Sequence, residues 1–168
     1  VKDDDVRSHT MHREPFVVTR ELLAILRDAV ASGRNITAVG TTSVRTLESL
    51  YYVGVKLMEG GNPTDVGQWE PYEREYSFTT EESLDAIIDY LDRNSLGGIS
   101  VGTQIIIVPG FRFRIVKSLI TNFHQPQSTL LLLISAFLGS ERWRDIYKFA
   151  LDNGFRFLSY GDSSLLFP

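Results

Sequence analysis

The chain has 168 residues, of which 43% are hydrophobic and 23% charged, as in an ordinary globular domain with one core. It lacks cysteine, which excludes disulfides, thiolate metal sites and cysteine nucleophiles and fits a reducing compartment. No apolar stretch is long enough to span a bilayer and no signal-peptide pattern is present, so we expect a cytoplasmic protein without membrane contact. Because the chain begins with Val1 at a polar sequence rather than with Met, we expect it to be part of a longer protein.

The net charge of −4 argues against wholesale electrostatic binding of nucleic acid, but the charge is unevenly distributed. Residues 1–103 hold ten Lys or Arg against seventeen Asp or Glu, whereas residues 104–168 hold seven against four. Aromatic residues alternate with arginines in the second part, as at 111–114. This part is a candidate RNA-facing surface, although such charges are more often simply solvated.

Apolar periodicity and turn residues predict the elements of the first half of the chain. In order, these are a helix from Thr19 to Gly33, a strand at 35–39, a helix after Gly40, a loop at 59–68, an edge strand at 72–78 and a helix capped by Thr80.

The same signals predict more strands and helices in the second half: strands at 103–108 and 111–116 joined by a Pro-Gly turn, a buried strand ending at Phe123, helices at 128–138 and 141–151, and a strand at 155–160. The run 104–108 reads as a strand buried on both faces, while 111–115 alternates and should expose its arginines on one side. Strands separated by helices imply an α/β fold, with a mixed, partly parallel sheet, helices packed on it, and one domain over residues 1–168.

Polar side chains crowd the junction between the strand that ends at Phe123 and the next helix. They are Thr121, Asn122, His124, Ser128 and Thr129. Unpaired N–H groups at the start of a helix attract negative or electron-rich ligand atoms, and this edge is the usual ligand edge of open α/β sheets. The alternative is that Ser128 only caps the helix and that Asn122 and His124 only shape a turn.

A second strand-to-helix junction carries Thr41, Thr42, Ser43 and Arg45 after Gly40. Its N–H groups and hydroxyls can cradle a carboxylate or phosphate. It lacks the ending of a P-loop and the three glycines of a dinucleotide fingerprint, so neither nucleotide motif applies. A simple capped helix start fits the spacing equally well.

The two ends of the chain carry further candidate groups. In an extended segment His12 and Glu14 face the same way and His9 the other, and a carboxylate beside an imidazole orients a general base. A structural salt bridge uses the same pair, and because a metal would need a third ligand we predict no metal site. Near the other end, Asp162 beside Tyr160 can bond a ribose or an amine, or can make an Asx turn.

Taken in order, five strings resemble the carboxyl-terminal half of the S-adenosylmethionine:tRNA ribosyltransferase-isomerase family of queuosine biosynthesis. They are HTMHRE at 9–14, AVGTTSVRTLES at 38–49, PGFRFRI at 109–115, LITNFHQPQSTLLLLISA at 119–136 and FLSYGD at 157–162. The resemblance implies the carboxyl-terminal part of that family's larger α/β domain, without its inserted β-barrel domain. It is weakest over residues 55–103.

The resemblance also implies an activity. Enzymes of this family transfer and isomerise the ribosyl group of S-adenosylmethionine onto 7-aminomethyl-7-deazaguanine at the tRNA wobble position, giving epoxyqueuosine, adenine and methionine. No cofactor beyond this substrate is implied. Acid–base roles fall to His12 or His124, with Glu14 and Asp162. Contacts to tRNA phosphates fall to Arg112, Arg114 and Lys117. Substrate binding falls to His9, Thr41, Thr42, Ser43, Arg45, Thr121, Asn122, Ser128, Thr129 and Tyr160.

The chain departs from the family pattern at three places. The family usually has Leu at Gln125 and Ala-Met at 163–164, and residues 69–94 read as an insertion. These departures leave open a paralogue with a different acceptor, or a non-catalytic protein that binds S-adenosylmethionine or RNA. An ordinary methyltransferase would give S-adenosylhomocysteine, but no glycine-rich loop follows the first strand. Without the family's amino-terminal half, we expect this chain alone to be inactive.

Overall fold

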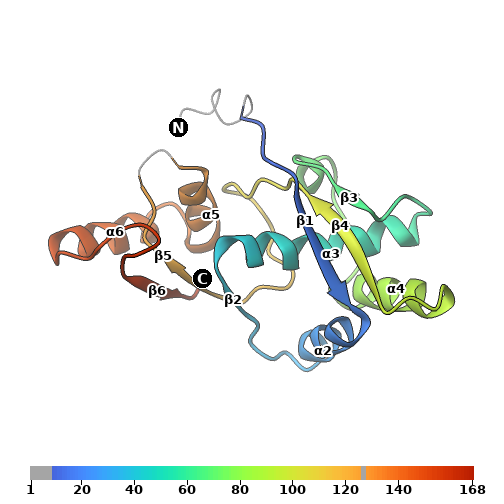
Figure 1. Cartoon of the computed structure of the whole chain (residues 1–168). Helices are drawn as coiled ribbons and strands as arrows, with labels where there is room; N and C mark the ends of the chain where they lie inside the picture. The colour runs from blue at the N-terminus through green and yellow to red at the C-terminus, as the bar shows by residue number, and fades with distance from the viewer. Residues whose placement is uncertain (1–8, 126–127) are drawn as a thin grey trace.

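The computed structural model describes residues 9–125 and 128–168. Its elements are, in order, β1 (Glu14–Thr19), α2 (Arg20–Ala31), β2 (Thr37–Val39), α3 (Thr41–Met58), β3 (Asp65–Val66), the 3-10 helix η1 (Glu70–Tyr72), α4 (Thr80–Arg93), β4 (Gly98–Thr103), β5 (Ser118–Asn122), α5 (Thr129–Leu138), α6 (Arg142–Asp152) and β6 (Ser163–Leu166). Figure 1 shows β1 and β4 crossing in front of α3, and α5, α6 and β6 lying toward the opposite end of the molecule from α4.

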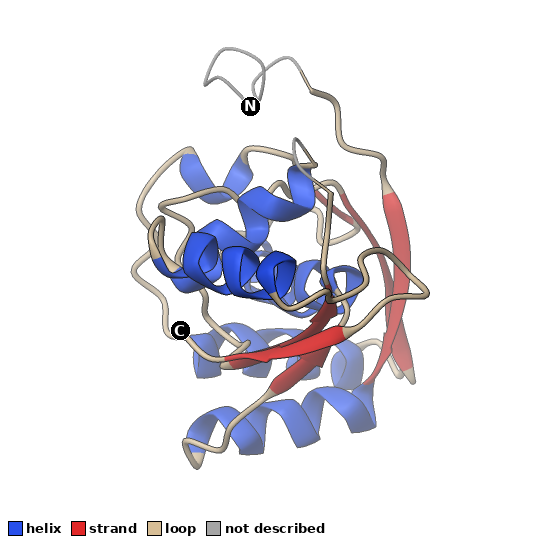
Figure 2. Ribbon diagram, turned by 90° about the vertical axis from the view of Figure 1, so that its left-hand side faces the viewer, coloured by secondary structure: helices blue, strands red, loops and turns tan. Residues whose placement is uncertain are grey.

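The strands form two three-stranded sheets, and each sheet is mixed. In the order β1-β4-β3, β1 is antiparallel and β3 parallel to β4; in the order β2-β5-β6, β2 is parallel and β6 antiparallel to β5. Strands and helices alternate in layers in the view of Figure 2. The predicted α/β class with partly parallel pairing is therefore confirmed, although the strands divide between two sheets.

The long helix α3 forms the centre of the core. It lies against β2 and β5 of one sheet and against β3 and β4 of the other, and it also packs on α4. Its middle is buried all round, including Leu50, Tyr51, Val53 and Val55. A helix that is buried on all sides is expected at the centre of a layered fold, and its buried Glu48 and Ser49 form hydrogen bonds there. Because α3 begins directly after β2, its first turn is held at the edge of the β2-β5 pair.

The buried segment from Gln104 to Val116 is not the predicted pair of strands. Its side chains are buried as expected, including Ile105, Ile106 and Ile115, but the segment forms no ladder. Single backbone bonds, such as Ile106 N–H to Gln68 O at 3.1 Å, and side chains satisfy its backbone instead: Tyr72 donates to Ile106 O and accepts from Val108 N–H. An apolar run indicates burial but not the partner of its backbone, and this is why the strand predictions at 103–108 and 111–116 were wrong.

Two other predicted strands are loops. Residues 72–78 begin with the last residue of η1 and are anchored by Tyr76, whose ring packs edge-to-face on Tyr52 with centroids 5.3 Å apart. Residues 155–160 form a tight loop, and the strand lies later, in β6. The helix predicted to be capped by Thr80 is capped one residue earlier by Thr79, which forms a capping box with Glu82.

The strands β1, β3, β4 and β6 were not predicted as such, and β3 lies within the loop predicted at 59–68. β4 contains Gly98 and Gly102, which are unfavourable in strands, yet a Cβ atom at Gly98 would lie only 2.7 Å from the backbone oxygen of Val18 in β1. Close approach of the neighbouring chain therefore requires a residue that weakens the strand signal. Within the described ranges, no helix combines the length and the apolar character needed to cross a membrane.

Candidate active site

The carboxyl ends of β2 and β5 lie side by side. The two strands are parallel with Val39 opposite Ile120, and Gly40 N–H donates to Ile120 O at 2.8 Å. The start of α3 and the residues that follow Ile120 therefore occupy one edge of the sheet. The structure thus brings together the two junctions that the sequence presented as separate candidates.

The first turn of α3 is open. Gly40 occupies the N-cap position with φ of 86°, a conformation that side chains other than glycine rarely adopt, and no side chain caps the helix. Ser43 donates its hydroxyl to Val39 O at 2.7 Å, so this group already has a partner. Thr41 is half-buried and Thr42 exposed at this end. The uncapped N–H groups give the edge a positive potential.

His124 is held at the same edge by two neighbouring hydroxyl groups. Its Nε2 lies 3.0 Å from the hydroxyl of Thr121, and its backbone N–H donates to the Tyr147 hydroxyl at 3.1 Å. Burial lowers the pKa of His124, which favours the neutral ring at neutral pH. A neutral, partly buried imidazole can accept a proton, which is the property required of a general base.

The other junction residues have partners within the fold. Ser128 caps α5 by accepting the N–H of Leu130 at 3.1 Å, as in the alternative reading, and Thr129 is the first residue of that helix. Asn122 directs its amide toward Asp162 O at 3.3 Å. These contacts order the rim of the edge around His124.

Glu14 is paired with Arg45 and not with His12. The Arg45 guanidinium bonds Glu14 at 2.7 Å and Ile105 O at 2.9 Å, and the residue is only 6% exposed. No ion pair joins His12 to Glu14, both of which lie within the described residues. Glu14 Oε2 and Arg45 Nη2 are buried and have no hydrogen-bond partner in the described part of the chain. The predicted imidazole–carboxylate pair is thus replaced by an ion pair between β1 and α3.

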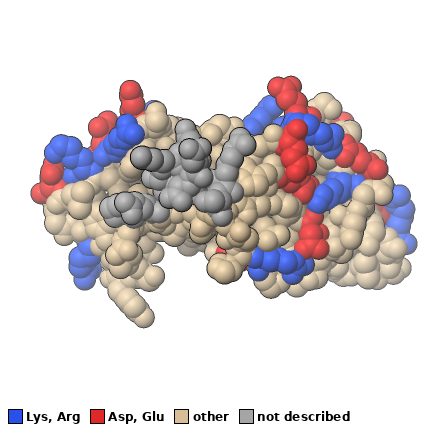
Figure 3. Space-filling view, turned by 90° about the horizontal axis from the view of Figure 1, so that it is seen from above, with Lys and Arg blue, Asp and Glu red and all other residues tan. Residues whose placement is uncertain are grey.

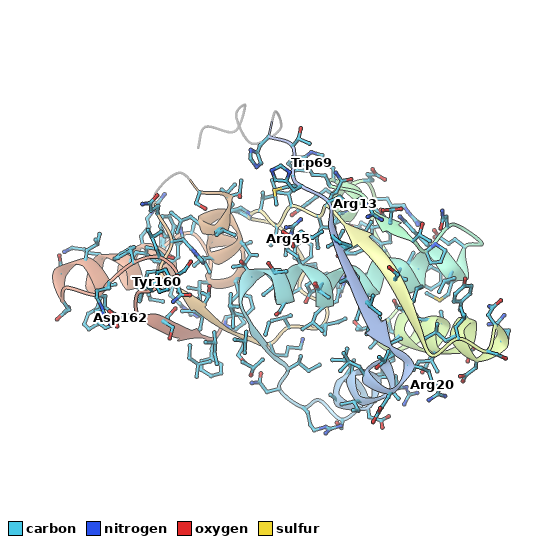
Figure 4. The ribbon with its side chains drawn as sticks, viewed as in Figure 1. Arg13, Arg20, Arg45, Trp69, Tyr160 and Asp162 are labelled. Carbon is cyan, nitrogen blue, oxygen red and sulfur yellow. The ribbon has the colours of Figure 1, made fainter. Side chains whose placement is uncertain are left out.

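The segment carrying His9 and His12 leads into β1. Gln68 fixes it by donating to His9 O and accepting from Met11 N–H at 2.9 Å. Both histidines are exposed. In Figure 4, Trp69 and Arg13 lie above Arg45, at the end of β1 where this segment approaches.

Tyr160 and Asp162 lie apart from Arg45, at the α6 and β6 end of the molecule (Figure 4). Asp162 accepts the backbone N–H of Arg156 at 2.7 Å, and this bond together with the Arg156 side chain lowers the pKa of its carboxyl group. The carboxylate therefore closes the loop from residue 156 to residue 162, which differs from the predicted Asx turn because the bonded N–H lies six residues earlier and not two residues later. Tyr160 is 98% exposed at the tip of that loop.

The three residues predicted to face tRNA have different surroundings. Arg112 and Lys117 are exposed. Arg114 instead lies 4.4 Å from the centroid of the Tyr51 ring and donates to Tyr76 O at 3.3 Å. The expectation that both arginines project from one face is therefore wrong, because the segment is not a pleated strand. From above, basic and acidic side chains are interspersed (Figure 3).

Parallel strands with polar side chains at their carboxyl ends are the arrangement in which α/β proteins place ligand sites. The chain belongs to the family described as "Queuosine biosynthesis protein", whose model matches residues 1–166. The resemblance seen in the motifs is thereby confirmed.

The chain is 39% identical over 166 residues to the S-adenosylmethionine:tRNA ribosyltransferase-isomerase of Nitratidesulfovibrio vulgaris. The matched region covers 99% of this chain and 34% of that protein. It is 40% identical over 167 residues to the protein of the same name in Agrobacterium fabrum, covering 99% and 35%. The crystal structure of S-adenosylmethionine tRNA ribosyltransferase from Thermotoga maritima superimposes with a TM-score of 0.62 and 29% identity, covering 90% of this chain and 40% of that one. The chain spans about a third of the length of the curated relatives.

Sequence reasoning missed Tyr147 and Gln68. Tyr147 reads as an apolar position of a helix, and Gln68 as part of a loop. Both act on the backbone of distant segments, so no local pattern identifies them. No group of three or more acidic or imidazole side chains arranged for a metal ion occurs among the described residues.

Proposed function

We propose that this chain is part of an enzyme that transfers and isomerises the ribosyl group of S-adenosylmethionine onto 7-aminomethyl-7-deazaguanine at the wobble position of a tRNA. The products are epoxyqueuosine in the tRNA, adenine and methionine. The observation that supports this most is that the α3 start and His124 share one edge of the β2-β5 pair, because both junctions belong to motifs of the family. The proposed partners are S-adenosylmethionine and the precursor tRNA, with no further cofactor and with a cytoplasmic location.

His124 is our first choice for the base that removes the acidic proton beside the sulfonium, and exposed His12 is the second. The environment of His124 favours this order, since burial lowers the pKa of its ring and Thr121 holds the ring nitrogen. The uncapped first turn of α3, with Thr41, Thr42 and Arg45, is proposed to receive the methionine carboxylate.

The remaining predicted residues have roles around this centre. Asn122 and Ser128 would contact the ribose, and Tyr160 would contact the nucleobase. Arg112 and Lys117, both exposed, would bind tRNA phosphates. Asp162 would act indirectly, because its carboxylate already holds the loop that carries Tyr160.

The test uses the full-length protein, S-adenosylmethionine and tRNA carrying the deazaguanine precursor, with adenine followed by chromatography. Adenine release that requires the modified tRNA is expected. His124→Ala should lower kcat about 10²- to 10⁴-fold, the usual contribution of a general acid–base group, while His12→Ala should leave more activity. Binding of S-adenosylmethionine by calorimetry shows whether each variant retains a folded site. If His12→Ala abolishes release and His124→Ala does not, the order of the two bases is reversed.

A paralogue with another acceptor, or without catalysis, is the second candidate function. The observation that favours it is Ser164, which stands where the family usually has Met and donates to Thr121 O at 3.2 Å, directly at the proposed edge. A folded full-length protein that binds S-adenosylmethionine yet releases no adenine with the modified tRNA would favour this candidate. S-adenosylhomocysteine as the product would instead indicate a methyltransferase.

A further inference from the structure

One peptide group, the one that joins Phe123 to His124, is held at both of its polar ends. Its carbonyl oxygen accepts the backbone N–H of Leu158 at 2.9 Å, and its N–H donates to the Tyr147 hydroxyl at 3.1 Å. The peptide lies just after β5, where no strand partner remains for it. The direction in which the His124 side chain leaves the backbone is therefore set by residues 23 and 34 positions later in the sequence.

The Tyr147 side chain is itself fixed by packing. It is 9% exposed, and its ring lies edge-to-face against three aromatic rings, with centroid distances of 5.4 Å to Phe123, 5.7 Å to Trp143 and 6.0 Å to Phe157. Such contacts restrict a ring to one orientation. Helix α6 and this packing therefore place the Tyr147 hydroxyl beside the backbone N–H of His124.

Leu158 binds the other end of the same peptide group. We call the two bonds, from Leu158 N–H to Phe123 O and from His124 N–H to Tyr147, the His124 clamp. It adopts φ of 70°, a left-handed conformation that costs a leucine about 1–2 kcal/mol. The loop around it is closed by Gly161 N–H to Leu158 O and by Asp162 N–H to Arg156 O, both at 2.8 Å. Strained residues persist where the surrounding bonds over-determine them, often beside functional sites. Here the strained residue aims its N–H at Phe123 O.

We propose that Tyr147 is a positioning residue for His124, which works together with the Leu158 turn and with Thr121 at the ring. Tyr147 does not touch the substrate. It holds the backbone of His124 so that the ring faces the edge of the β2-β5 pair in one orientation. This inference rests on the proposed function, in which His124 carries out the proton transfer, and adds a residue and a mechanism of positioning to it.

Tyr147→Phe in the full-length protein removes the hydroxyl and retains the aromatic packing. Since a misplaced catalytic group costs about 10²-fold when displaced by an ångström, we expect kcat for adenine release to fall about 10- to 100-fold, with KM for S-adenosylmethionine within about twofold. The acid limb of the pH profile and the NMR titration of the His124 ring should both move to higher pH, because a freed loop admits water to the ring.

Tyr72→Phe is the matched control. Tyr72 also accepts a backbone N–H, that of Val108 at 3.0 Å, and is also partly buried, but it lies outside the His124 clamp. It should lose at least as much stability, because the Tyr72 hydroxyl also donates to Ile106 O, without moving the His124 titration. A fall in kcat of the same size in both variants would mean that Tyr147 acts only through stability and would overturn the inference.

Two other results separate this inference from the proposed function. Adenine released by the wild type, with kcat and the His124 titration unchanged in Tyr147→Phe, would overturn the positioning role alone. No adenine from the folded wild type would overturn the proposed function. If Tyr147→Phe does not fold, hydrogen exchange of the wild type decides: the His124 amide should exchange far more slowly than that of exposed Gln125, and equal exchange would contradict the clamp.

Discussion

Glu48 is a fully buried carboxylate that organises backbone with no partner strand. It accepts the N–H groups of Arg114 at 2.8 Å, Ile115 at 3.0 Å and Val116 at 2.8 Å. Burial raises the pKa of Glu48, while these three bonds favour the charged form and oppose the rise. A single side chain of α3 thus replaces the ladder that a neighbouring strand would have provided.

Glu48→Gln should lower the free energy of unfolding by about 2–5 kcal/mol. The glutamine NH₂ group would face backbone N–H groups that the carboxylate oxygens accept, so two donors would oppose each other. Urea unfolding of the chain measures the change. Glu59→Gln is the control, since its ion pair with Arg74 is on the surface and should contribute at most about 1 kcal/mol. Equal losses in the two variants would contradict the role given to Glu48.

His124 should make stability depend on pH. Its folded-state pKa is lowered by burial, so its contribution to stability is complete above the unfolded pKa of about 6.5 and is lost as pH falls through the folded value. The free energy of unfolding should therefore decrease as the solution is acidified below about pH 6.5. In His124→Asn this decrease should be smaller, as followed by urea unfolding at several pH values. An unchanged slope would place the titration elsewhere.

At the scale of elements, the α3–α4 contact depends on Gly54. A methyl group there would overlap the backbone oxygen and hydroxyl of Ser83, which donates to Tyr51 O at 2.6 Å. Gly54→Ala should raise helix propensity and still destabilise the chain, by about 1–3 kcal/mol, because two buried helices must separate. Gly67→Ala, whose added methyl meets only ordinary contacts, should change the urea midpoint little. A stabilised Gly54→Ala would show that the helices can shift freely.

The end of α4 offers a change in the opposite direction. Ser95 follows the C-cap residue Asn94 with φ of 54°, and Leu96 N–H bonds Leu91 O at 2.9 Å as in a Schellman motif. This position favours glycine, so Ser95→Gly should stabilise the chain by about 0.5–1 kcal/mol. Thermal unfolding tests this, and a lower melting temperature would contradict it. Ser100→Gly, at an exposed position of the central strand β4, should destabilise instead.

At the scale of the whole molecule, the positive charge of the carboxyl-terminal part is divided between surface and core. Arg112→Ala and Lys117→Ala in the full-length protein should each weaken tRNA binding and lower the slope of log K against log salt by up to about one. Arg114→Ala should mainly lower stability, because its guanidinium lies over the Tyr51 ring. Filter binding at several salt concentrations, with unfolding measured in parallel, separates the effects. Loss of binding in Arg114→Ala alone would reverse the assignment.

The sequence by itself determined the class of fold, most helices, and the polar residues that gather at the two junctions; their chemical roles stay predictions. Helical periodicity is local, and caps such as Thr19 and Ser128 act within one turn, so these features can be recognised without the rest of the chain. The family also follows from the sequence, since its motifs are short strings that retain their order. The expectation that 69–94 is an insertion stays a prediction, although α4 within it packs into the core.

Only the tertiary structure decided which groups face one another. Glu14 pairs with Arg45 across 31 positions, Glu48 binds backbone 66 to 68 positions away, and Tyr147 holds His124 from another helix. A buried polar group must find some partner, but the sequence does not say which one, because that partner is set by how the layers pack. For the same reason an apolar run such as 104–108 predicted burial correctly and strand pairing wrongly. Composition and spacing thus determine which residues must be buried or capped. The packing of α3 between the two sheets determines which groups become their partners.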